Sequence, residues 1–246
     1  MVEAIFKLLR RETSGLHQAA FLLGFFALLS QILALVRDKL LASTFGAGAD
    51  LDLYYAAFRV PDFLFVTLGS LVSLSVLIPF LMLELGKGKE NARPFVDSVF
   101  SIFLFGILAV SLIVFVCAPY LIEYLFPGFS NASIESVITL TRILLFSPIL
   151  LGISNLFGSL VQSSNRFLVY ALSPLVYNAG IIIGILFLYK PFGLAGLAYG
   201  VIIGAFFHFA IQVPTVIDLG LFPRLTFRPD FKRVKDVMLL SVPRTI

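Results

Sequence analysis

Residues 30–83 read SQILALVRDKLLASTFGAGADLDLYYAAFRVPDFLFVTLGSLVSLSVLIPFLML and form two long apolar runs joined by a short turn. Charged residues interrupt both runs, whereas a membrane-spanning helix normally carries none. Arg37 and Asp38 lie near the end of the first run, and Arg59 and Asp62 flank Pro61 inside the second. A charge at membrane depth costs roughly 2.5–3.5 kcal/mol on insertion scales and normally faces a protein interior or a water-filled cavity. We therefore expect this helical hairpin to line a cavity.

The turn FGAG at residues 45–48 indicates that the two helices run antiparallel. Arg37 lies about ten residues before the turn and Arg59 about eleven after it, so at 1.5 Å per residue both lie about 15 Å from the tip. Asp52 precedes Arg59 by about two helical turns, which places both on nearly the same face, with the carboxylate nearer the turn. These positions predict a cationic site with an acidic entrance. The alternative is that these three residues neutralise one another and only hold the helices together.

The composition of the whole chain indicates its fold class. The 246 residues are 59% hydrophobic and 13% charged, and the mean hydropathy is +1.03. Average usage in soluble domains is about 25% charged. Several apolar runs approach the roughly 20 residues that a helix needs to cross the hydrocarbon, and they lack the alternation of barrel strands. We predict an all-α integral membrane protein. The single cysteine, Cys117, excludes an internal disulfide and a cysteine-based metal framework.

Six membrane-spanning helices are expected, together with the start of a seventh. The first covers residues 16–44, and the second runs from about 53 to 83 with a kink or break near Pro61. The third covers about 95–117 and is expected to end at Pro119. The remaining three are expected at about 136–161, from the turn at 162–166 to about 189, and from the turn at 190–193 to about 217.

This pattern divides the chain into three parts. Residues 1–15 carry basic and apolar residues that suit an amphipathic helix on the cytoplasmic membrane surface. Residues 16–219 form the six-helix lobe. Residues 220–246 form a basic connection and the beginning of a seventh helix, so we expect the chain to be a truncated part of a longer protein.

The distribution of lysine and arginine predicts the orientation. The N-terminal segment, the loop at 86–94, Arg166 and residues 221–235 together carry twelve of them, against Lys190 alone in the opposite loops. The N-terminus is therefore predicted to be cytoplasmic, which places Arg37 and Arg59 in the outer half of the membrane. This bias also accounts for the net charge of +4, so no nucleic-acid partner is expected.

The sequence offers no pattern of soluble-enzyme chemistry. The two histidines, His17 and His208, are far apart, and the chain has no HExxH, P-loop, GxSxG or CxxC motif. We predict no enzyme activity, no catalytic residue, no metal site and no cofactor. Asn178 is a candidate for lining the cavity because Pro174, one turn earlier, frees a carbonyl nearby. Arg142 is interpreted either as an interface anchor or as a third cation above the cavity.

Several motifs resemble one family of membrane proteins. Residues 30–38 (SQILALVRD), the turn at 45–48, and FRVPD at 58–62 followed by Pro79 are similar to the N-terminal hairpin of the MurJ (MviN) lipid II flippases. Further along, PGF at 127–129, LLFSP at 144–148 and NRF at 165–167 fall where that family has similar segments. The resemblance spans nearly the whole chain in the right order.

The resemblance implies a member of the multidrug/oligosaccharidyl-lipid/polysaccharide exporter superfamily in the bacterial inner membrane. Such proteins have two pseudo-symmetric helical lobes around a central cationic cavity, and this chain would supply the N-terminal lobe. The family moves the undecaprenyl-diphosphate-linked peptidoglycan precursor outward by alternating access. The implied partners are therefore an anionic polyprenyl diphosphate lipid, the membrane, and a second lobe or a second copy.

The resemblance also implies roles for single residues. Arg37 matches a functional arginine of the first helix, Asp52 an acidic residue at the cavity mouth, and Arg59 a basic position of the second helix. Gln31 stands where the flippases have an arginine, and Phe65 and Val66 stand where basic residues are expected. Both differences reduce the charge available to a diphosphate, because neither glutamine nor phenylalanine replaces a bidentate guanidinium.

Two other functions stay open beside the flippase. One is a cation-coupled exporter of small molecules or polysaccharide-linked lipids from the same superfamily, with Asp52 as the cation site. The other is a membrane scaffold of cell-wall synthesis that does not transport.

Overall fold

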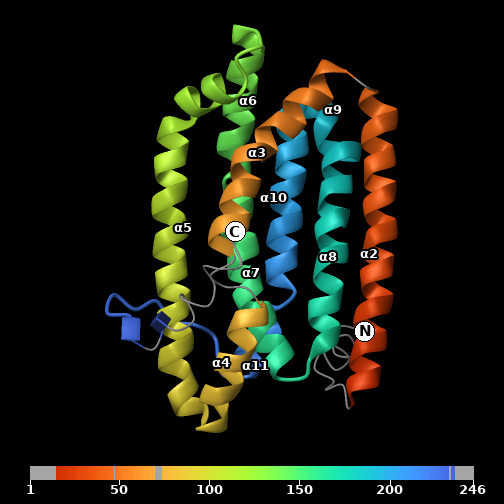
Figure 1. The fold of residues 1–246 in the computed structure, drawn as a ribbon. Coiled ribbons are helices and arrows are strands. Elements are labelled where there is room, and N and C mark those ends of the chain that lie inside the picture. The colour runs from red at the N-terminus through yellow and green to blue at the C-terminus, as the bar shows by residue number, and fades with distance from the viewer. Residues whose placement is uncertain (1–14, 47, 70–73, 233, 236–246) are drawn as a thin grey trace.

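The computed structural model describes residues 15–46, 48–69, 74–232 and 234–235, and these residues form helices and loops without a strand. The elements are α2 (Leu16–Phe45), α3 (Ala49–Gly69), α4 (Leu74–Gly86), α5 (Lys89–Leu125), α6 (Asn131–Leu144), α7 (Phe146–Ser163), α8 (Phe167–Ile183), a π-helical segment (Gly184–Leu188), α9 (Tyr189–Phe192), α10 (Leu194–Ala210) and α11 (Val213–Asp218). Figure 1 shows the long helices side by side in one bundle. The predicted surface segment at residues 1–14 and the start of the seventh helix near 237 lie outside the described residues.

The all-α membrane class is confirmed. Among the described residues, five helical stretches are long and apolar enough to cross a membrane: His17–Phe45, Lys89–Leu125, Asn131–Ser163, Phe167–Phe192 and Leu194–Asp218. The second predicted span corresponds to α3 and α4, and residues 70–73 between them lie outside the described residues. The described part of the chain is therefore a bundle of several transmembrane helices.

Pro61 does not end the second helix, because α3 continues to Gly69. A proline removes the N–H that would bond the carbonyl four residues earlier, which here belongs to Ala57. The hydroxyl of Thr141 in α6 donates to that carbonyl at 3.2 Å. The helix can pass through the proline because a neighbouring helix supplies the missing donor.

The third span is longer than predicted. It begins at Lys89 rather than near 95 and passes through Pro119 to Leu125, so the prediction that Pro119 ends it was wrong. The fourth also begins earlier, at Asn131, because the Ser130 side chain accepts a hydrogen bond from the Ser133 N–H and caps the helix. Leu145 separates this span into α6 and α7.

Glycines allow α8 and the π-helical segment that follows it to lie in direct backbone contact with α10. A Cβ on Gly180 would lie 2.3 Å from the Gly204 Cα, and one on Gly200 would lie 2.5 Å from the Gly184 Cα. Such small residues permit close helix packing in membranes.

The buried apolar side chains form two clusters. One includes Leu77, Phe95 and Phe157 of α4, α5 and α7. The other joins α3, α6, α8 and α10.

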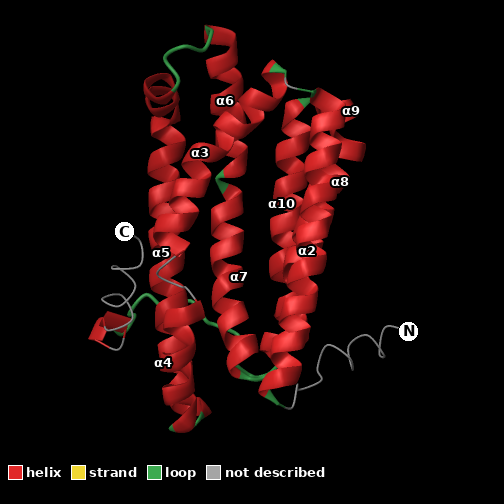
Figure 2. Ribbon diagram, turned by 45° about the vertical axis from the view of Figure 1, so that its right-hand side comes forward, coloured by secondary structure: helices red, strands yellow, loops and turns green. Residues whose placement is uncertain are grey.

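Most loops of the described chain lie at the two ends of the bundle, whereas the segment after α11 lies beside α5 (Figure 2). Its backbone N–H groups bond to side chains of α5: Arg224 donates to Asp97 at 2.7 Å, Thr226 to Ser101 at 2.8 Å and Asp230 to Ser98 at 3.0 Å. The non-helical backbone is thus satisfied by polar side chains of a helix.

Candidate functional site

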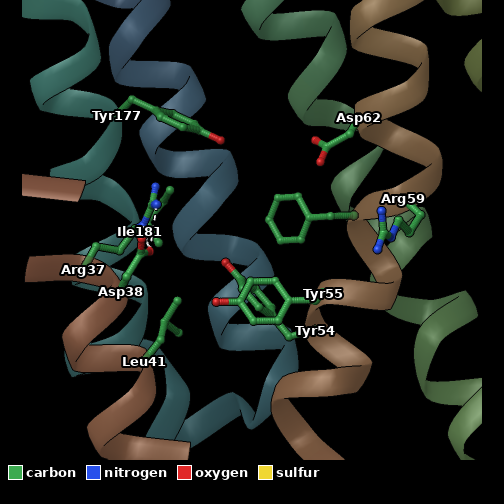
Figure 3. Close-up of a pocket in the computed structure, with 10 residues that line it drawn as sticks. Arg37, Asp38, Leu41, Tyr54, Tyr55, Arg59, Asp62, Tyr177 and Ile181 are labelled. Carbon is green, nitrogen blue, oxygen red and sulfur yellow. Dashed lines mark hydrogen bonds and ion pairs between the residues drawn. The ribbon is translucent and has the colours of Figure 1, made fainter. Parts of the chain in front are cut away.

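A pocket of about 490 Å³ lies between α2 and α8 on one side and α3 on the other (Figure 3). Its lining residues come from three helices and combine charged with aromatic side chains: Arg37, Asp38, Leu41, Tyr54, Tyr55, Phe58, Arg59, Asp62, Tyr177 and Ile181. The volume falls within the roughly 300–1,000 Å³ of small-molecule sites. The charged hairpin therefore lines a cavity, as its sequence indicated.

Arg37 is held in place by two partners. Its Nε and one terminal nitrogen each lie 2.8 Å from Oδ1 of Asp38, and the other terminal nitrogen donates to Oδ1 of Asn178 at 2.9 Å. Its side chain is 24% exposed. A guanidinium has five N–H donors. Because the protein uses three of them, two are left for a ligand.

Asn178 is itself fixed by its surroundings. It is 6% exposed, and its amide nitrogen donates to the Pro174 carbonyl at 3.0 Å and lies 3.3 Å from the Ser30 hydroxyl. These contacts orient Oδ1 toward Arg37. The sequence made Asn178 a candidate for lining the cavity; it is not among the residues that line the pocket, but it bonds to Arg37, which does line it.

Arg59 and Asp62 reach the pocket from α3, across from Arg37 (Figure 3). The structure therefore brings the two predicted arginines to one site. Two aspartates, Asp38 and Asp62, line the same pocket, so the formal charges of the described lining residues cancel. The prediction of a cationic site was thus incomplete, because Asp62 was not counted among its residues.

The aromatic side of the pocket was also missed. Tyr54, Tyr55, Phe58, Arg59 and Asp62 share one face of α3, and the Tyr54 and Phe58 rings contact edge to face with centroids 4.9 Å apart. The spacing i, i+1, i+4, i+5, i+8 is visible in YYAAFRVPD and is typical of a single helix face. This pattern could have identified the tyrosines and Asp62 from the sequence.

Asp52 and Gln31, like Asn178 and Arg142, are predicted site residues that do not line this pocket. Asp52 is exposed in the first turn of α3, and Gln31 is exposed on α2. Neither is among the residues that line the pocket. The proposed acidic entrance at Asp52 therefore stays a prediction, and Asp62 is the carboxylate of α3 that lines the pocket.

Arg142 has a structural partner on α5. Its Nε donates to the Phe115 carbonyl at 3.1 Å, and its guanidinium carbon lies 4.8 Å from the centre of the Phe115 ring. Of the two interpretations offered by the sequence, this geometry favours the interface anchor over a third cation above the cavity.

His208 belongs to a second polar cluster. Its Nδ1 lies 2.7 Å from the Ser154 hydroxyl, and the Gln212 amide donates to the same oxygen at 2.6 Å. This cluster joins α7 to α10. Among the described residues, no group of three His, Cys, Asp or Glu side chains could hold a metal ion.

A family profile matches most of the chain. The family described as "Lipid II flippase MurJ" matches residues 41–246. A protein of Thermotoga maritima named "Probable lipid II flippase MurJ" is 33% identical over 218 residues, which cover 85% of this chain and 44% of that protein. The chain spans between 39% and 46% of the length of the curated relatives it matches.

Solved structures show the same helical arrangement. A structure titled "Lipid II flippase MurJ, inward closed conformation" aligns with a TM-score of 0.74 at 28% identity, and the alignment covers 92% of this chain and 47% of that one. A structure titled "Crystal structure of MATE in the straight conformation" aligns with a TM-score of 0.69 at 17% identity over 97% of this chain. The second likeness shows the fold alone.

Proposed function

The chain belongs to the MurJ family of lipid II flippases, and we propose that it forms the headgroup-binding lobe of such a flippase. In this proposal the pocket between α2, α3 and α8 holds the diphosphate of a polyprenyl-linked cell-wall precursor. The activity moves a lipid between leaflets and makes or breaks no covalent bond. The membrane is the bacterial inner membrane, and the N-terminus lies on its cytoplasmic side.

The arrangement of Arg37 carries the proposal. Two N–H groups of a fixed guanidinium remain available, and Arg59 lines the same pocket. Arginine binds phosphate oxygens in a bidentate manner, and such charge-assisted hydrogen bonds are roughly twice as strong as neutral ones. A bound diphosphate would also offset the repulsion between the two cations.

Transport requires more than this lobe. In the proposal, a second lobe covers the face that Arg37, Arg59 and Asp62 line, and the two lobes rock against each other so that the pocket opens to one side of the membrane at a time. The rest of a longer polypeptide or a second copy of the chain would supply that lobe.

A second function is favoured by one observation. Because the charges of the lining residues cancel and the basic residues of the flippase pattern are replaced by Gln31, Phe65 and Val66, an exporter of a less strongly charged lipid or small molecule also fits the pocket. Coupling to a cation would then drive export.

Replacement of an essential flippase tests the proposal. A bacterium whose own lipid II flippase can be switched off should grow and keep its shape when it carries the full polypeptide that contains this chain. The same polypeptide with Arg37→Ala, present at an equal level, should not support growth. Failure of the unsubstituted polypeptide to restore outward movement of labelled lipid II, with normal membrane insertion, would favour the exporter instead.

A further inference from the structure

Asp62 lies between two cavities. Beside the main pocket is a side chamber of about 30 Å³, lined by Phe58, Pro61, Asp62, Phe65, Leu144, Ser147, Pro148, Leu151 and Tyr177. Phe58, Asp62 and Tyr177 line both spaces. A cavity needs roughly 10–15 Å³ to hold a water molecule, so the chamber has room for a water beside the carboxylate.

The two pocket aspartates differ in their partners. Asp38 accepts both contacts from Arg37 at 2.8 Å. For the Asp62 carboxylate, no hydrogen bond or ion pair shorter than 4.0 Å occurs within the described part of the chain. Arg59 on the same helix acts on it only through the electrostatic field. Asp38 is therefore committed to an arginine, whereas the Asp62 carboxylate is available to a ligand.

The surroundings of Asp62 suit a carboxyl group that gains and loses a proton. The other titratable and charged groups that line the pocket are Tyr54, Tyr55 and Arg59 from α3, Arg37 and Asp38 from α2, and Tyr177 from α8. The Tyr177 ring contacts His208 of α10. Leu144 of α6 and three residues of α7 also line the side chamber, and none of them is charged: Ser147, Pro148 and Leu151. Tyrosine hydroxyls and Ser147 can accept a hydrogen bond from a protonated carboxyl.

The charge of Asp62 decides the net charge of the pocket. When both aspartates are ionised, their charges cancel those of the two arginines. When Asp62 is neutral, the pocket carries one net positive charge. An anion at Arg37 and Arg59 therefore favours the neutral form of Asp62, and a neutral Asp62 favours the anion. By linkage the two effects are equal in size.

We propose that Asp62 is a proton-binding residue of the pocket and that binding of an anion is coupled to uptake of one proton at its carboxylate. The proton moves from solvent to a carboxylate oxygen, and no covalent bond between heavy atoms changes. The inference rests on the proposed function, because it needs an anion in the pocket. The lobe would then bind a proton together with the anion.

Calorimetry in several buffers tests the coupling. The purified full polypeptide is titrated with farnesyl diphosphate at neutral pH in buffers that differ in their heat of ionisation, and the dependence of the observed heat on the buffer gives the number of protons taken up. The unsubstituted protein should take up close to one proton more than Asp62→Asn does. The probe's own protonation is common to both proteins and cancels in this difference.

The affinity gives a second measurement. Binding to the unsubstituted protein should weaken by up to about tenfold per pH unit as pH rises through the range where Asp62 ionises, whereas Asp62→Asn should bind with a weaker pH dependence. Asp50→Asn is the matched control, because Asp50 lies on the same helix and outside the pocket. It should keep the proton uptake of the unsubstituted protein.

The outcomes separate the two proposals. Equal proton uptake by Asp62→Asn and the unsubstituted protein, with both binding the probe, would overturn the role of Asp62 alone. Absence of binding by the unsubstituted protein and by Asp62→Asn would overturn the proposed function as well. Binding of the probe could instead depend on sodium concentration rather than on pH, and lose that dependence in Asp62→Asn. Asp62 would then be a sodium site, and the proposed proton uptake would be contradicted.

Discussion

Arg142 donates to the carbonyl of Phe115 at 3.1 Å, which is the carbonyl that Pro119 leaves without a donor in α5. The proline lies four residues after Phe115, and a helix would normally satisfy that carbonyl with the N–H at this position. A side chain of α6 thus replaces a backbone hydrogen bond of α5. The contact ties together two helices on either side of the loop at residues 126–130.

This relationship predicts the effect of two substitutions. Arg142→Ala should lower stability by about 1–3 kcal/mol, since it leaves a carbonyl unsatisfied in a membrane-spanning helix. The same change in a Pro119→Ala background should cost less, because an alanine in place of the proline restores the backbone N–H. Thermal unfolding of the four proteins in detergent measures the coupling. Equal costs in both backgrounds would show that the carbonyl does not explain the role of Arg142.

The contact between α8 and α10 predicts a second effect on stability. Gly180→Ala should destabilise the protein by about 1–3 kcal/mol, because a Cβ there would lie 2.3 Å from the Gly204 Cα and must push the helices apart. Gly106→Ala in α5 is the control, since its Cβ would have no neighbour within 4 Å. Replacing a helical glycine that has free space around it by alanine should stabilise the protein slightly. Similar melting temperatures for both variants would contradict this packing.

Asn178 is predicted to act through Arg37. Asn178→Ala removes one of the partners that hold the guanidinium, so binding of farnesyl diphosphate should weaken several-fold while the protein stays folded. Ser173→Ala in the same helix removes a buried hydroxyl that bonds the Val169 carbonyl and has no contact with Arg37. This control should keep its affinity. Loss of affinity in both variants would point to a general disturbance of α8.

The orientation predicted by the lysine and arginine distribution can be tested with two glycine sites. Gly128 lies in the loop between α5 and α6, Gly86 ends α4, and a Cβ at either would have no neighbour within 4 Å. With Cys117 replaced by serine, Gly128→Cys should react with a membrane-impermeant maleimide in intact cells, and Gly86→Cys should react only after lysis. The reverse pattern would place the N-terminus outside.

Much of the fold could be predicted because apolar runs and basic loops reflect the bilayer directly. The ends of helices were harder. Pro119 suggested a helix end, and only the three-dimensional contact with Arg142 shows why the helix continues. Pro61 posed the same difficulty, since the donor to the Ala57 carbonyl comes from Thr141, far away in sequence.

The site was predicted in part for a similar reason. The hairpin geometry placed Arg37 and Arg59 near each other, because both distances run along regular helices from one turn. The partner Asn178 lies in a helix far along the chain, and its contact with Arg37 depends on how α2 packs against α8. Asp62 was not predicted as a site residue because the spacing argument placed the carboxylate at Asp52, two helical turns before Arg59, whereas the pocket follows the face of α3 that carries the tyrosines.

The central claim is that Arg37 and Arg59 bind a diphosphate headgroup. The direct measurement is the dissociation constant of farnesyl diphosphate for the full polypeptide and its Arg37→Ala, Arg37→Lys, Arg59→Ala and Arg142→Ala variants, each checked for folding. Arg37→Ala and Arg59→Ala should each weaken binding by about tenfold or more, because a hydrogen bond between charged groups contributes about 1.5–3 kcal/mol. Arg37→Lys should recover binding only in part, since an ammonium lacks the planar fork, and Arg142→Ala should bind as the unsubstituted protein does. Unchanged affinity in Arg37→Ala, or an equal loss in Arg142→Ala, would contradict the assignment and leave Arg37 as an ion pair that holds the helices together.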